Sequence, residues 1–136
     1  MIAVEVQHYL SRARDFFKGM DLLKDDLEGY RYSSALLGIH SAISYCDALR
    51  IGMGSKKLSS DDHSRAAEEL KSLLNACEFE QQQGVKHLRL LLSRKSRISY
   101  AAETMRPNEV EDIVKRAMRF ADWAEKTGKA LKIEVW

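Results

Sequence analysis

"GVKHLRLLLSRKSRISYAAETMR", residues 84–106, is the segment of the chain that is most clearly an amphipathic helix. Apolar residues recur there at three- and four-residue steps, as on the buried face of a helix: Leu88, Leu91, Leu92, Ile98, Ala102 and Met105. The other positions carry positive side chains against the single acid Glu103: Lys86, Arg89, Arg94, Lys95, Arg97 and Arg106. We therefore expect this helix to pack into a core on one side and to offer cations to an anionic partner on the other.

The same periodicity predicts four further helices along the chain. Their apolar stripes run over residues 6–27, 32–49, 70–77 and 110–131. Gly52 and Gly54 suit the exit of the second helix, and Ser60, Asp61 or Asp62 can cap the third. Asn108 with Glu111 is the expected capping box of the fifth helix. Residues 80–84 are consistent with a short break or with a helix start.

These helices predict an all-α fold, an antiparallel up-and-down bundle of about five helices, four long and one short, with the short third helix across an end. A chain of 136 residues without an internal repeat or a linker fits one domain, residues 1–136. The tail 132–136 alternates apolar and polar residues, and its terminal Trp136 is expected to pack against a surface.

Charge and cysteine content narrow the class of protein. The net charge of +2 excludes a polycation that would bind nucleic acid indiscriminately. Residues 1–81 hold 10 basic and 13 acidic side chains, whereas residues 82–136 hold 12 basic and 7 acidic ones. An anion would therefore prefer the second half of the chain. Cys46 and Cys77 occupy apolar helical positions without metal-ligand spacing, which predicts reduced core thiols, no metal and no cofactor. No leader and no membrane-length apolar run is found, so we expect a cytoplasmic protein.

The stretch Tyr30–Leu49 resembles the signature helix of HEPN domains, in which an aromatic-rich start leads into small residues and a polar or acidic end. Further pieces similar to that family follow in the family's order: Asp62-His63 at a helix start, then Arg94, Arg97 and Tyr100 on a leucine-rich helix, then Ala117, Phe120 and Ala121 on the last helix. The resemblance covers residues 5–130. It implies an up-and-down bundle, frequently a homodimer, of the kind found in toxin–antitoxin, defence and nucleotide-handling systems.

Catalytic members of the HEPN family carry an arginine and a histidine separated by four to six residues. None of the four histidines, His8, His40, His63 and His87, has an arginine at that distance before it. The departure predicts a noncatalytic protein with no catalytic residue, while leaving the fold and a binding role in place.

Metal-free RNA cleavage needs a proton acceptor, a proton donor and cations on the phosphate, and separate helices can supply them. His40, Ser44 and Asp47 form a polar stripe at i, i+4 and i+7, and His63 begins the third helix. If these residues face the basic helix, they converge with its arginines, and an aromatic ring there can stack on a base. The candidate binding residues are therefore His40, Asp47, His63, Arg94, Arg97 and Tyr100.

Structural roles explain the same residues equally simply. His40 fits a helix-packing boundary, and Asp47 can pair with Arg50 or Arg94 to join two helices. His63 can cap a helix or remain solvated, the charges around residues 94–97 suit a solvated face, and Tyr100 can anchor the bundle.

Three functions remain after these considerations. The first is a noncatalytic HEPN-like binding module for a nucleotide, RNA or a protein partner such as a nucleotidyltransferase-type antitoxin. The second is a metal-independent endoribonuclease toxin with a displaced histidine, His63 or His40. The third is a structural adaptor for an acidic protein. A homodimer is expected from the resemblance and from apolar residues near both chain ends, including Val4, Tyr9, Trp123 and Trp136.

Overall fold

The residues that the structure describes form five α-helices, as the sequence predicts. The computed structural model describes residues 2–56, 63–100 and 104–136, and for residues 64 and 100 the backbone alone. The helices are α1 (Ile2–Leu23), α2 (Arg31–Gly52), α3 (Ala66–Ala76), α4 (Gly84–Tyr100) and α5 (Pro107–Ala130). Two 3-10 turns, Lys24–Asp26 and His63–Arg65, precede α2 and α3. The described residues contain no strand, and the expected division into four long helices and one short helix is confirmed.

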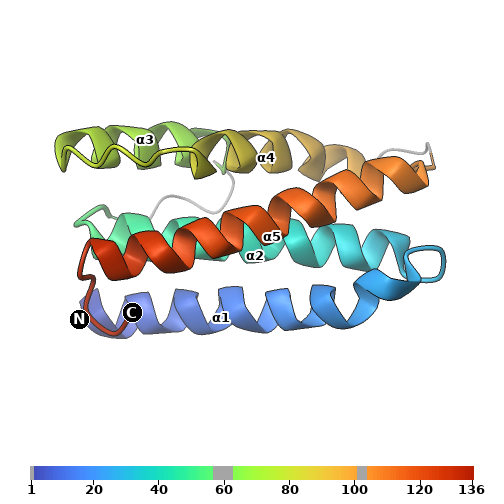
Figure 1. The fold of residues 1–136 in the computed structure, drawn as a ribbon, viewed down its shortest axis with the longest axis horizontal. Coiled ribbons are helices and arrows are strands. Elements are labelled where there is room, and N and C mark those ends of the chain that lie inside the picture. Colours follow the sequence, from blue (N-terminus) through green and yellow to red (C-terminus); the bar gives the residue numbers. More distant parts are fainter. Residues whose placement is uncertain (1, 57–62, 101–103) are drawn as a thin grey trace.

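The second helix lies at the centre of the molecule and contacts all four other helices. In Figure 1, α1 forms one outer layer, α2 and α5 lie in the middle, and α3 and α4 form the opposite layer. Helix α3 runs along the long axis of the molecule, so the expectation that it crosses an end is wrong. Both chain termini lie at the same end.

Small residues allow α2 to be buried on most of its circumference. Gly38 faces both neighbouring helices, since an added Cβ would lie 2.9 Å from Met20 Sδ and 3.0 Å from Ala117 Cβ. The Ser41 hydroxyl, which is also buried, donates a hydrogen bond of 2.8 Å to the carbonyl oxygen of Ala13 on α1. Because such residues let helix backbones approach closely, α2 packs against neighbours on several sides rather than along one stripe.

The start of α5 differs from the expected one. Pro107 is the first helical residue, a position where its missing N–H and fixed φ cost nothing, and Arg106 is the residue before the helix. The Arg106 backbone N–H donates to the Glu109 carboxylate at 3.4 Å. The capping box expected from Asn108 and Glu111 is therefore wrong. The expected caps of α3 at residues 60–62 lie outside the described residues.

The C-terminal tail packs on its own chain. Ile133 packs on Gly52, where an added Cβ would lie 2.6 Å from the Ile133 side chain. Trp136 packs on Gly128, where an added Cβ would lie 2.1 Å from the Trp136 indole. The Trp136 ring stacks on Tyr45 with centroids 6.5 Å apart. Expected packing of the terminal tryptophan is thus confirmed.

Two of the aromatic residues that motivated a homodimer are consequently used inside the chain. Trp123 is only 6% exposed, and Trp136 is half-buried against α2 and α5. Val4 remains exposed. Within the described part of the chain, no helix combines the length and the apolar character that crossing a membrane requires.

Candidate functional site

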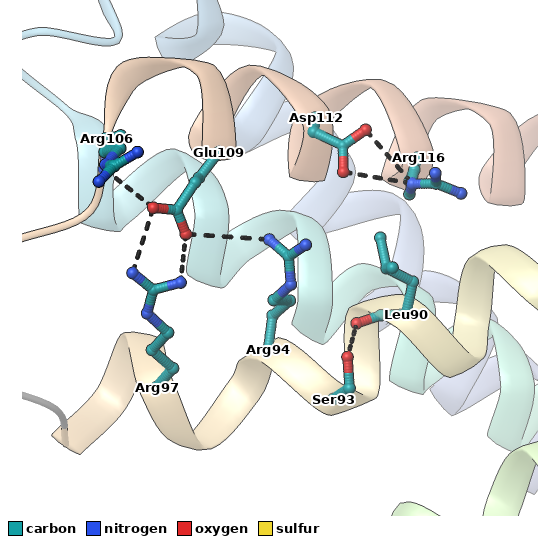
Figure 2. A network of polar contacts seen from close by, with 8 residues as sticks. All are labelled: Leu90, Ser93, Arg94, Arg97, Arg106, Glu109, Asp112 and Arg116. Carbon is teal, nitrogen blue, oxygen red and sulfur yellow. Dashed lines mark hydrogen bonds and ion pairs between the residues drawn. The ribbon is translucent and has the colours of Figure 1, made fainter.

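Two arginines of the basic helix converge on one carboxylate of α5. Arg94 and Arg97 extend from α4 toward Glu109, as Figure 2 shows. Arg97 Nη2 donates to Glu109 Oε1 at 3.1 Å, and Arg97 Nη1 pairs with Oε2. Arg94 Nη1 lies 4.0 Å from the same Oε2. The Pro107 start of α5 fixes the position of Glu109, so the end of the bundle where α4 finishes and α5 begins carries an arginine cluster, which we define as Arg94, Arg97 and Arg106.

The electrostatics of this cluster keep Glu109 ionised at neutral pH. Burial alone would raise the pKa of Glu109, but the hydrogen bond from the Arg106 N–H and the charges of Arg97 and Arg94 outweigh burial and lower it. The side chains of Arg94 and Arg97 are 29% and 38% exposed, so both guanidinium groups also reach solvent. Arg94 donates no hydrogen bond within the described ranges 2–56, 63–100 and 104–136, and its donors are available to a ligand.

Two exposed tyrosines lie at the start of α2, and one of them, Tyr32, contacts the residue before Arg106. Arg31, which lies between Tyr30 and Tyr32 in the sequence, donates a hydrogen bond from Nη1 to the carbonyl oxygen of Met105 at 3.0 Å. The Met105 N–H in turn donates to the hydroxyl of Tyr32 at 3.4 Å. Tyr30 and Tyr32 are 47% and 44% exposed. The sequence places Tyr32 on the apolar stripe of α2 and so predicts that it is buried. That prediction is wrong, because Tyr32 lies in the first turn of α2, at the end of the bundle, and is exposed.

His40 lies in a second location, between α1, α4 and the turn before α3. Its ring contacts Phe16 with centroids 5.7 Å apart. Burial lowers the pKa of His40, and the charges of Lys95 and His63 lower it further. His40 is therefore neutral at pH 7 and within electrostatic reach of both groups. His63 and Lys95 of α4 are thus close enough to His40 for their charges to act on it.

Asp47 belongs to a structural ion-pair cluster. It accepts from Arg50 Nη2 at 2.6 Å, while Arg50 Nη1 donates to Glu69 of α3 at 3.1 Å. Arg50 is 2% exposed, and its Nε has no hydrogen-bond partner among the described residues. A buried guanidinium held by two carboxylates joins α2 to α3, which is the structural alternative that the sequence offered for Asp47.

The two cysteines have different environments. Cys46 is buried beside Arg50, and burial raises the pKa of its thiol to about 12, so it is an unreactive core thiol as expected. Cys77 is exposed, and its assignment to the core is wrong because α3 ends at Ala76 and Glu78 takes a positive φ of 55°. Among the residues that the structure describes, no three His, Cys, Asp or Glu side chains gather at metal-binding distance.

Thus Arg94 and Arg97 lie together, His40 and His63 form a separate neighbourhood, and Asp47 is held by Arg50. The side chain of Tyr100 lies outside the described residues, as does Asp62. Sequence reasoning missed Tyr30 and Tyr32 as site residues, although their place in a Tyr-Arg-Tyr run was an available signal. Comparison of the chain with protein-family models, with curated proteins and with solved structures gives no match.

Proposed function

We propose that this chain is a noncatalytic HEPN-like binding module for RNA or a nucleotide, built on an antiparallel up-and-down bundle and working in the cytoplasm. The observation that carries the proposal is the arrangement of Arg94 and Arg97 around Glu109. A guanidinium group binds phosphate through paired N–H donors, and Arg94 has such donors available beside a second arginine.

The exposed tyrosines support a ligand that contains bases. The Tyr32 hydroxyl accepts a hydrogen bond from the N–H of Met105, the residue before Arg106, and the exposed Tyr30 is the residue that precedes α2. Aromatic rings beside cations are how proteins hold single-stranded nucleic acids, since bases stack on the rings while phosphates meet the cations.

The test is the affinity for a fluorescein-labelled single-stranded RNA, measured by anisotropy over a range of salt concentrations. Binding should weaken as salt rises, and the double change Arg94→Ala/Arg97→Ala should reduce the slope of log affinity against log salt by about 1.4, because each phosphate contact to a single strand contributes about 0.7. Arg89→Ala is the matched control, since Arg89 lies on the same helix but pairs with Glu68 of α3. Wild-type protein that binds no RNA would instead favour the structural adaptor.

A second candidate function is supported by the neighbourhood of His40. A neutral imidazole at His40 can accept the 2′-hydroxyl proton, His63 can protonate the leaving 5′ oxygen, and Lys95 can stabilise the phosphate, which describes metal-independent RNA cleavage to a cyclic phosphate. Cleavage that persists in chelator and disappears in both His40→Ala and His63→Ala would establish this activity. Intact single-stranded and structured RNA after incubation would remove it.

The resemblance also proposes partners. We propose a homodimer, with a nucleotidyltransferase-type antitoxin as its counterpart in a toxin–antitoxin pair. Sedimentation of the pure protein at micromolar concentration distinguishes a dimer from a monomer. Exposed apolar side chains near the N-terminus, Ile2 and Val4, are available to such an interface.

A further inference from the structure

A groove lies at the opposite end of α5 from the arginine cluster. It has a volume of about 460 Å³ and is bounded by the segment before α4, the first turn of α4 and the second half of α5. Its walls include Phe79, Gln83, His87, Arg119, Trp123 and Lys126. Trp123 and Glu109 are fourteen residues apart on one helix, or about 21 Å along its axis. Small-molecule sites occupy roughly 300–1,000 Å³, so this groove is of suitable size.

The apolar wall of the groove is fixed in place. An added Cβ on Gly84 would lie 2.2 Å from the Trp123 indole, so the first residue of α4 packs directly on that ring. The Trp123 indole N–H donates to the carbonyl oxygen of Gln81 at 2.8 Å, and Phe120 packs on the same ring with centroids 5.5 Å apart. The wall is therefore preformed, which lowers the entropic cost of binding a ligand against it.

The polar wall is cationic and includes a buried histidine. Arg116 Nη1 lies 3.3 Å from His87 Nδ1, and because guanidinium can only donate, Nδ1 accepts and the neutral ring carries its proton on Nε2. Burial lowers the pKa of His87, and so do the charges of Arg116, Lys86 and Arg119, whereas Asp112 opposes them. The groove region thus concentrates positive charge around a neutral imidazole.

One cation of the groove is available to a ligand. Asp122 is the acidic residue of the lining, and it accepts from Lys126 at 2.9 Å. Arg119 forms no ion pair with any residue in the part of the chain that the structure describes. Arg119 therefore lines the groove with a positive charge that no carboxylate of the described residues neutralises.

We propose that this groove binds a small organic anion in which a carboxylate or a phosphate is attached to a flat apolar ring system. The ring lies against Phe79 and Trp123, and the anionic group meets Arg119, with His87 as a neutral neighbour. Guanidinium recognises both carboxylate and phosphate through two parallel N–H donors, which is the chemistry that the two ligand classes share. This site is separate from the arginine cluster and does not depend on the proposed RNA-binding function.

The experiment is a titration of isotope-labelled protein followed by ¹H–¹⁵N NMR, with 2-naphthoate and 2-naphthyl phosphate as the two anionic probes. Neutral 2-naphthalenemethanol and inorganic phosphate represent the two halves of the ligand. We expect at least one aromatic anion to shift the Trp123 indole N–H and to bind at least tenfold more tightly than either half. The better of the two probes distinguishes a carboxylate ligand from a phosphate ligand.

Arg119→Ala should weaken that probe at least tenfold, whereas Lys115→Ala, an exposed change one turn earlier on α5, should stay within twofold. The pKa of His87, read from its ring protons, should rise when the probe binds, because the anion offsets the cations around it. The proposal is overturned if the neutral alcohol binds as tightly as the anions, if Arg119→Ala binds as well as wild type, or if shifts map away from the groove. Loss of RNA binding in Arg94→Ala/Arg97→Ala should leave this titration unchanged.

Discussion

Glu125 holds three helices and the C-terminal tail together, and its removal is the most informative stability test. Its carboxylate accepts two hydrogen bonds of 2.8 Å from Arg14 on α1, one of 2.7 Å from the Tyr45 hydroxyl on α2, and one of 3.1 Å from the Trp136 indole. In Glu125→Ala all four donors lose their acceptor at once. We therefore expect the change to weaken packing of α1 and of the tail against α2 and α5.

The cost follows from the burial of each donor. Tyr45 is 3% exposed, so leaving its hydroxyl without an acceptor costs about 1–3 kcal/mol. The side chains of the Arg14–Glu125 pair are 40% and 27% exposed, which limits the ion pair to about 0.5–1 kcal/mol. Together with the indole hydrogen bond, we expect Glu125→Ala to lower the free energy of unfolding by about 3 kcal/mol.

Urea unfolding followed by circular dichroism measures this difference. Tyr45→Phe removes only the hydroxyl and should cost about 1 kcal/mol. Glu111→Ala removes an exposed carboxylate from the same helix and should stay within about 0.5 kcal/mol of wild type. A Glu125→Ala protein as stable as Glu111→Ala would refute the assignment of Glu125 as the polar centre of the fold.

The same residue predicts a pH dependence. The hydrogen bond from Arg14 is the main cause that lowers the pKa of Glu125, burial opposes it, and Tyr45 and Trp136 assist. Because the folded pKa lies below the ordinary value, the unfolded chain takes up the proton first, and the stability that Glu125 contributes is complete at neutral pH. It is lost as the pH falls from about 4.5 through the lower folded pKa, so the difference between wild type and Glu125→Ala should shrink over that range.

Three further predictions concern packing and reactivity. Gly84→Ala should destabilise by about 1–3 kcal/mol in urea unfolding, because a methyl group cannot fit 2.2 Å from the Trp123 indole, and an unchanged midpoint would contradict that contact. Arg50→Ala should cost about 3–5 kcal/mol, since it leaves two carboxylates near each other without their cation, and thermal unfolding should show the loss. Ellman's reagent should modify Cys77 in the native protein and Cys46 only after unfolding, and equal rates would contradict their different burial.

The helices could be predicted from sequence because the three- and four-residue spacing of apolar side chains is visible within each segment, without knowledge of the helices that pack against it. Residues 84–100 and 107–130 are helical as their leucine and alanine spacing indicates, but the predicted helix over residues 84–106 is too long, because α4 ends at Tyr100 and residues 104–106 are not helical. Their ends were less predictable, since Pro107 and Asn108 both suit a helix start, whereas the structure begins α5 at Pro107 with Glu109 bonded to the residue before it. Cys77 shows the same limit, because a periodic stripe does not reveal that the helix stops one residue earlier.

The candidate site was less predictable, because a cation's partner lies on another helix. The basic character of α4 is evident in the sequence, but its arginines form ion pairs with different helices. Arg89 pairs with Glu68 of α3, and Arg97 pairs with Glu109 of α5. The pairing of Asp47 with Arg50 was foreseeable from their spacing on one helix, whereas the third member, Glu69, required the tertiary fold. Exposure of Tyr32 likewise depends on where the bundle ends.

We propose that Glu109 holds Arg94 and Arg97 ready for a phosphate rather than neutralising them permanently. Glu109→Gln removes the competing charge while preserving the size of the side chain, and its RNA affinity is measured by anisotropy. We predict that this variant binds single-stranded RNA about fivefold more tightly than wild type, corresponding to the roughly 1 kcal/mol of a partly exposed ion pair. Glu111→Gln, with the same change in net charge on an exposed residue of α5, should bind less than twofold more tightly. Equal affinities for Glu109→Gln and Glu111→Gln would contradict the account and assign the arginines to the scaffold.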